Sequence, residues 1–487
     1  MGIVFRQSLN NSIVTYAGFG IGALNTLVLY LNFMNPKYYG LIQVILSAAT
    51  VLNPILAFGV PNTLVKFYSS FENNKVKEGF LTLMLLLPLV LMLPIAVLTF
   101  VGNEAIGSFL SRENPIVRDY VWHIFLIGMA MAYFEVFYGW ARVHMKSVFG
   151  NFMKEVFSRV AVSVMLLLLH FEYITVEFFV HALVGVYVLR MIVMKVYAYS
   201  LHMPKLSFEF PHNIRNIMVY TSLIILGGSV AIVLLEVDKV MINQFIELEN
   251  VAYYSVAGFI AMVIAVPSRS MHQITYPLTA EQLNNKDLAS LERLYKKSSL
   301  TLFAIASLLF LLIFLNLDDM YTMMPEDYRN GYMIFVWLGL AKVYDSILGN
   351  NNSILYNSDY YKAILMFGVL LAVLTILLNL WLIPAYGLDG AAIASFSALF
   401  IYNTLKLAYV RWKFKILPFT TETWQVGIIS MVLGVGFYYI DFPFHAVINI
   451  ILKGILITTL FVGLLYKFKI SEDLYTLLTR ILSKVKR

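Results

Sequence analysis

The sequence predicts an all-α polytopic membrane protein with about fourteen transmembrane helices. Apolar residues make up 60% of the 487 residues and charged residues 13%, whereas soluble domains average about 45–50% and about 25%. The apolar residues recur in runs from residue 13 to residue 466, and each run is close to the roughly 20 residues that a helix needs to cross a bilayer core. No stretch between the runs is large enough to form a soluble domain.

Helices, and not strands, are expected because a single span must pair every backbone N–H and C=O within itself. The first run follows a polar N-terminus and has no small-residue cleavage signature, so it is expected to be a retained helix. The predicted spans in chain order are residues 13–34, 41–62, 80–101, 119–140, 152–171, 177–199, 215–236, 251–273, 299–317, 331–350, 361–383, 387–409, 424–441 and 446–466.

The basic residues predict the orientation, because short loops rich in Lys and Arg stay on the cytoplasmic side. The odd-numbered connections carry few of them, whereas the even-numbered connections and the termini carry most. Both termini and the loops at 73–77, 144–154 and 284–297 are therefore expected to be cytoplasmic. The net charge of +7 is spread over these loops, which indicates contact with anionic lipid headgroups and not with nucleic acid.

A faint internal repeat divides the chain. Tyr38-Tyr39 and Tyr253-Tyr254 each open the second helix of a six-helix half. We expect an N-terminal lobe at 1–205, a second lobe at 206–415, and two additional helices with a cytoplasmic tail at 416–487. Two halves of like orientation are typical of a transporter built from parallel repeats around a site near the midplane.

Polar residues at helical spacing mark one face of the first two spans. Asn11, Thr15 and Asn25 lie on the first, and Gln43 and Asn53 on the second. Such a stripe indicates either tight helix packing or a water-filled cavity, and the residues alone leave both interpretations open.

Charged residues inside spans are costly and need a partner or water. Lys342 lies mid-span, with Asp345 following on its face, so it is either a substrate contact or half of a neutralising pair. Arg159 and Arg190 lie about two turns inside the membrane, close enough to the interface to snorkel as anchors, and Lys453 is expected to snorkel outward.

The sequence excludes several chemistries. Cysteine is absent, so disulfides, Cys-based metal sites and thiol nucleophiles are ruled out. No phosphate-binding glycine loop or nucleophile elbow appears, so no enzymatic activity, cofactor or metal is expected.

Four segments resemble the polysaccharide-unit (O-antigen type) flippases of the multidrug/oligosaccharidyl-lipid/polysaccharide exporter superfamily. They are the Asn-rich first helix leading to Tyr39-Gly40, the segment 58–69, the Asp238-Lys239 pair with Tyr254-Ser255, and the turn NLWLIPAYGLDGAAIAS at 379–395. The resemblance implies two six-helix lobes around a central cavity. It also implies transport of an undecaprenyl-pyrophosphate-linked oligosaccharide to the outer leaflet of the bacterial inner membrane by alternating access.

The expected function is therefore a flippase. Its partners would be the lipid-linked oligosaccharide, membrane lipids, a polysaccharide polymerase and glycosyltransferases. The alternatives are a cation-coupled small-molecule exporter, which would depend on carboxylates, and a membrane polysaccharide polymerase or ligase, which would need a large outer loop. The candidate substrate-binding residues are Lys342, Arg159, Asp345, Glu135, Asn25, Gln43, Asn53, Glu236, Asp238, Lys239 and Arg269.

Overall fold

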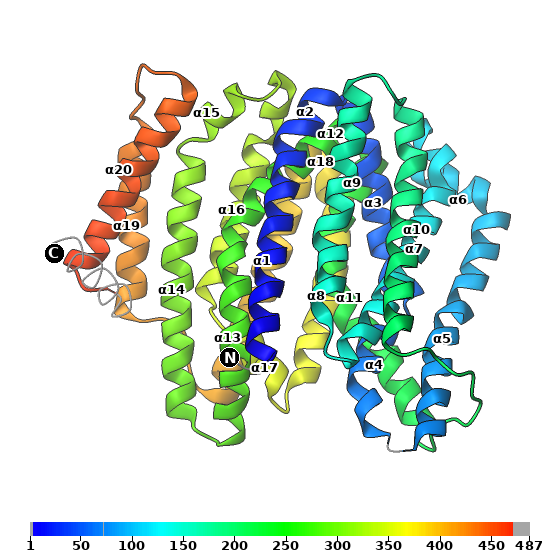
Figure 1. Ribbon diagram of the computed structural model, residues 1–487. Coiled ribbons are helices and arrows are strands. Elements are labelled where there is room, and N and C mark those ends of the chain that lie inside the picture. The colour runs from blue at the N-terminus through cyan, green and yellow to red at the C-terminus, as the bar shows by residue number, and fades with distance from the viewer. Residues whose placement is uncertain (1–2, 72, 471–487) are drawn as a thin grey trace. The chain divides into compact units, whose positions relative to one another are not determined.

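The computed structural model describes residues 3–71 and 73–470, so the end of the predicted cytoplasmic tail, 471–487, lies outside the described residues. Every regular element in the described part is helical (Figure 1). Contacts divide the chain into two compact units. Unit 1 comprises Met1–Ser255 and Thr375–Leu388, and unit 2 comprises Val256–Leu374 and Asp389–Arg487. The lobe boundaries at 205 and 415 remain a prediction.

Unit 1 is built around α7, which packs against α3, α4 and α10. Trp140, Phe134 and Phe80 are fully buried in its core. The helices that begin in this unit are α1 (Ile3–Leu24), η1 (Asn25–Leu29), α2 (Tyr30–Phe33), α3 (Pro36–Leu56), α4 (Val60–Phe67), α5 (Asn74–Val101), α6 (Asn103–Leu110), α7 (Val121–Val143), α8 (Ser147–Phe152), η4 (Met153–Phe157), α9 (Ser158–His170), α10 (Val176–Leu201), α11 (Ile214–Phe245) and α12 (Leu248–Met262).

Gly40 explains one motif of unit 1. A Cβ added at Gly40 would lie 1.9 Å from the carbonyl oxygen of Leu248, so α3 can approach the start of α12 only without a side chain there. The preceding Tyr39 stacks on Tyr30 with ring centroids 4.2 Å apart. The Tyr-Gly pair therefore fixes how the second span leaves the first.

Unit 2 is organised by α14, which packs against α13, α16 and the hairpin of α19 and α20 (Figure 1). Leu311, Leu433 and Phe461 meet in a buried core, while Trp424, on the outer face of the hairpin, is 71% exposed. The helices of this unit are α13 (Val266–Asn284), α14 (Leu288–Phe314), α15 (Leu317–Thr322), α16 (Tyr332–Ile347), α17 (Asn351–Asn357), most of α18 (Tyr361–Phe414), α19 (Thr421–Tyr438) and α20 (Ala446–Lys467).

The helix α18 contains two predicted spans. Its 54 residues would make a straight helix about 80 Å long, far more than the roughly 30 Å of a bilayer core. The backbone breaks at Gly387, with φ 58° and ψ −133°, a conformation that is essentially restricted to glycine. The break lies where the sequence separates the spans 361–383 and 387–409.

The prediction of an all-α polytopic membrane protein is confirmed. Within the described residues, nine helices are long and apolar enough to span a membrane, or ten if the pair Glu326–Ile347 and Asn351–Asn357, bent by 57°, is one span. Each of the fourteen predicted ranges falls on helical backbone. The count of fourteen membrane crossings remains a prediction.

Candidate functional site

The predicted site residues fall into separate groups in the two units. Unit 1 contains Glu135, Arg159 and the polar residues of the first, second and seventh spans, whereas unit 2 contains Lys342, Asp345 and Arg269. Arg269 is exposed, and Lys342 is partly buried.

The first group in unit 1 joins α3 to α11. Lys239 Nζ donates to Gln43 Oε1 at 3.2 Å and lies 3.0 Å from Glu236 Oε2. Ser47 Oγ donates to the same carboxylate oxygen at 2.6 Å. The structure therefore brings the candidate residues Gln43, Glu236 and Lys239 together, in a group whose charges cancel.

Asp238 and Asn25 serve buried contacts. Asp238 is 2% exposed and accepts hydrogen bonds from Tyr254 and from Asn379 Nδ2, the latter at 2.7 Å. Asn25 opens the π-helix η1, and its Nδ2 donates to the carbonyl of Arg159 at 2.8 Å. The Oδ1 atom of Asn53 is buried without a hydrogen-bond partner.

Arg190 is absent from the predicted site, but it lies in a charged group with two residues that the sequence did predict, Glu135 and Arg159. The side chain of Arg190 is buried between aromatic rings, with its guanidinium carbon 4.4 Å from the centroid of Phe134 and 4.6 Å from that of Tyr187. Its Nε is buried without a hydrogen-bond partner, and no carboxylate of the described residues lies within ion-pair distance of its guanidinium. The expectation that Arg190 snorkels is wrong, because the side chain points into packed rings and is only 7% exposed.

Two ion pairs flank this guanidinium. Lys154 Nζ lies 2.6 Å from Glu135 Oε1, and Arg159 Nη1 lies 2.7 Å from Glu155 Oε2. Arg190 interacts electrostatically with both carboxylates, and Glu135 also interacts with Arg142. The cationic cluster, defined as Arg142, Lys154, Arg159, Arg190, Glu135 and Glu155, therefore has four basic groups for two carboxylates. It can bind an anion without first losing an ion pair.

In unit 2 the structure places a further basic residue beside Asp345, Lys406, which is absent from the predicted site. Lys406 Nζ lies 3.9 Å from Asp345 Oδ1, and its side chain is 1% exposed. The neutralising pair of Asp345 and Lys342 that the sequence suggests therefore does not include Lys406, a buried cation beside the same carboxylate.

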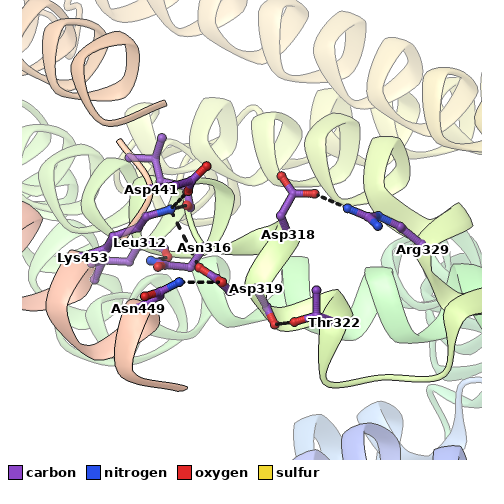
Figure 2. Close-up of polar contacts among 10 residues, drawn as sticks. Leu312, Asn316, Asp318, Asp319, Thr322, Arg329, Asp441, Asn449 and Lys453 are labelled. Atoms are coloured by element: carbon purple, nitrogen blue, oxygen red, sulfur yellow. Dashed lines mark hydrogen bonds and ion pairs between the residues drawn. The ribbon is translucent and has the colours of Figure 1, made fainter. Parts of the chain in front are cut away.

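Lys453 does not snorkel as expected. Its side chain is 5% exposed, and its Nζ lies 2.6 Å from Asp441 Oδ1 and 3.8 Å from Asp319 Oδ2. Asn449 Nδ2 donates to the other oxygen of Asp319 at 3.3 Å. Figure 2 shows this polar clamp, defined as Lys453, Asp441, Asp319 and Asn449, between the hairpin and α15. Because Asp441 and Asp319 lie close to its Nζ, the Lys453 side chain does not need to extend outward to reach a counterion.

A histidine group joins the ends of α7 and α10. His202 Nε2 lies 2.7 Å from Glu78 Oε1, and His144 Nε2 lies 3.4 Å from the hydroxyl of Tyr68. Burial, together with the neighbouring His202 and Lys77, lowers the pKa of His144. The His144 ring is therefore neutral at neutral pH and can accept the hydrogen bond of Tyr68.

Comparison with known proteins assigns the family. The sequence matches a family described as polysaccharide biosynthesis protein over residues 5–283, which is more than half of the chain. The chain belongs to the polysaccharide biosynthesis protein family. This membership confirms the resemblance to polysaccharide flippases. A comparison with curated proteins gives no match.

Solved structures share the fold of this polysaccharide biosynthesis family member. A lipid II flippase MurJ in an inward closed conformation superposes with a TM-score of 0.76 at 14% identity, covering 94% of this chain and 99% of that one. An inward-facing multidrug resistance MATE family transporter of the MOP superfamily gives 0.60 at 14% identity, covering 82% and 94%. MATE in a straight conformation gives 0.55 at 15% identity, covering 85% and 96%. These similarities establish a flippase and exporter fold.

Proposed function

We propose that this protein flips an undecaprenyl-pyrophosphate-linked oligosaccharide from the cytoplasmic to the periplasmic leaflet for cell-surface polysaccharide assembly. The observation that carries the proposal is the cationic cluster around Arg190. A diphosphate brings negative charge and acceptor oxygens, and a guanidinium offers a planar set of donors that matches them. The excess of basic groups in the cluster would compensate the diphosphate while the prenyl tail stays in lipid.

The alternatives fit less well. A cation-coupled small-molecule exporter would need carboxylates free to bind the coupling cation, but Glu135, Glu155 and Glu236 each have a basic partner. A polymerase or ligase would need a sizeable loop to hold sugar acceptors. In the described part of the chain, the longest stretch without a helix is only 202–213, so we propose transport without enzymatic activity.

Deletion of the gene is expected to strand lipid-linked oligosaccharide on the cytoplasmic leaflet while its synthesis by glycosyltransferases continues. The intermediate would be quantified in membranes of the deletion strain and its leaflet determined with a glycosidase that cannot cross the membrane. If the intermediate reaches the periplasmic leaflet normally but is not polymerised, the polymerase alternative replaces the flippase.

Both termini are proposed to face the cytoplasm, with the protein in the inner membrane. Single cysteines can be introduced without background, because the chain has none. We expect an impermeant thiol reagent applied to intact cells to label Asp318→Cys and to leave Lys75→Cys and Lys286→Cys unlabelled. Asp318 is a better probe than Asp319 because its side chain is 68% exposed. If only Lys75→Cys and Lys286→Cys are labelled, the proposed orientation is wrong and the topology is the inverse.

We also propose, as the sequence predicts, that Lys342 contacts the diphosphate during transport. Because a charge-assisted hydrogen bond contributes about 1.5–3 kcal/mol, Lys342→Ala should weaken transport roughly ten- to a hundredfold, and Lys342→Arg should retain part of it. Export and membrane abundance would be measured for Lys342→Ala, Asp345→Ala and the double mutant. Full export by the double mutant would show that Lys342 only neutralises Asp345.

A further inference from the structure

Lys406 is a buried cation that the proposed anion site in unit 1 does not use. Its side chain is 1% exposed, and its Nζ donates to Asn352 Oδ1 at 2.8 Å. The ring centroid of Tyr402 lies 4.3 Å from the same nitrogen. The neighbours of Nζ thus include one neutral amide, one aromatic ring and the carboxylate of Asp345 at 3.9 Å.

These contacts compensate the ammonium only in part. Burial penalises the charged form of lysine, and a nearby carboxylate favours it. At 3.9 Å the carboxylate attracts the ammonium but lies beyond hydrogen-bond distance. A buried lysine balanced in this way changes its protonation state more readily than one in a close ion pair.

A route for a proton to leave is present. The side chain of Asp345 is 43% exposed, so its carboxylate connects the buried nitrogen to water. His272 on α13 interacts electrostatically with both Asp345 and Lys406. The other charged or titratable neighbours include Tyr402, which interacts with Asp345 and Tyr356, and Lys342, which lies one turn before Asp345 on α16.

We propose that Lys406 and Asp345 form a proton-exchange site in unit 2, with His272 as the adjacent proton carrier. One proton leaves Nζ, crosses through a bridging water molecule to a carboxylate oxygen of Asp345 at 3.9 Å, and passes from there to solvent or to the imidazole of His272. The ammonium becomes a neutral amine, and the net charge of the pair changes from zero to minus one. The neutral amine still donates to Asn352. Its electrostatic attraction to the carboxylate of Asp345, which links α18 to α16, is lost. The proton therefore controls the contact between these helices.

This proposal rests on the proposed flippase function, and a vesicle assay tests it. The full chain would be reconstituted in phosphatidylglycerol-containing vesicles with an undecaprenyl-pyrophosphate-linked oligosaccharide, at zero membrane potential. With a pH gradient of about one unit across the vesicle membrane, the exchange of one proton per transport cycle shifts the distribution of this lipid between leaflets about tenfold. We expect this shift in the wild type, its loss in Lys406→Met, and its retention in Lys362→Met, which removes an exposed lysine from the same helix.

A second measurement does not depend on transport. The melting temperature would be followed against pH for the wild type, Lys406→Met, Asp345→Asn and Lys362→Met. The profile of Lys406→Met should differ from that of the wild type, and that of Lys362→Met should not. Asp345→Asn should move the pH-dependent change in melting temperature to lower pH, because the ammonium of Lys406 loses the carboxylate that stabilises it.

The outcomes separate the two proposals. If the wild type moves no lipid-linked oligosaccharide, the flippase function fails, and the melting profiles still decide the proton site. If the wild type moves the lipid but does not respond to the pH gradient, the proton-exchange site is refuted. It is also refuted if Lys406→Met keeps the wild-type response to the pH gradient or the wild-type melting profile.

Discussion

Replacing Arg190 by methionine is expected to lower transport about a hundredfold or more while the protein stays folded. The guanidinium lies between Phe134 and Tyr187, and its buried Nε has no hydrogen-bond partner, so an anion that reaches it gains a donor without displacing another bond. Two charge-assisted hydrogen bonds to a diphosphate contribute at least about 3 kcal/mol, which corresponds to a factor of at least about a hundred. Methionine keeps contact with the two rings and removes a buried charge, so the fold should survive.

Two further variants make the Arg190 experiment decisive. Arg190→Lys keeps the charge but loses the planar donor set, so it should restore only part of the transport. Arg112→Met is the matched control, because Arg112 also lies over an aromatic ring, that of Phe245, but is exposed. Leaflet translocation would be compared at equal membrane abundance. Wild-type transport by Arg190→Met would assign Arg190 to structural anchoring.

The second large effect is expected at the polar clamp. Asp319→Asn combined with Asp441→Asn leaves the buried ammonium of Lys453 without a carboxylate. Breaking a buried pair in this way costs about 3–5 kcal/mol of unfolding free energy. Adding Lys453→Met should recover most of that stability, because the orphaned charge is removed.

A nearby surface pair provides the control for the clamp. Asp318 lies 2.9 Å from Arg329, and both side chains are more than half exposed, so Asp318→Asn should cost at most about 1 kcal/mol. Thermal unfolding in membranes and protease cleavage between α19 and α20 would be measured. If the double aspartate variant is no less stable than Asp318→Asn, the clamp does not hold the hairpin.

The helices could be predicted from the sequence because a bilayer imposes a fixed length on apolar runs. The prediction stopped the seventh span at 236, whereas α11 continues to Phe245. The charged residues Asp238 and Lys239 ended the apolar run, but in the structure each is satisfied by polar partners from other helices. Hydropathy along one helix cannot anticipate partners supplied by another.

Part of the site is predictable from polar spacing and from the family motif. Gln43 is predicted from a polar helical stripe and Lys239 from the Asp-Lys motif, and in the structure these two residues meet together with Glu236. Arg190 was treated as an anchor because the rings that bury it come partly from α7, which is distant in sequence. Lys406 is not predictable from hydropathy because it lies close to the basic end of its span, although Tyr402 one turn earlier places an aromatic ring on the same face.

The polar clamp also bears on how the last two helices enter the membrane during synthesis. Asp441 and Lys453 both belong to the hairpin, whereas Asp319 precedes it by more than a hundred residues. Moving an unpaired lysine through hydrocarbon costs about 2.5–3.5 kcal/mol on insertion scales, and a carboxylate in the same hairpin offsets part of that cost. The hairpin thus carries its own counterion through insertion and gains Asp319 only when it docks on the finished bundle.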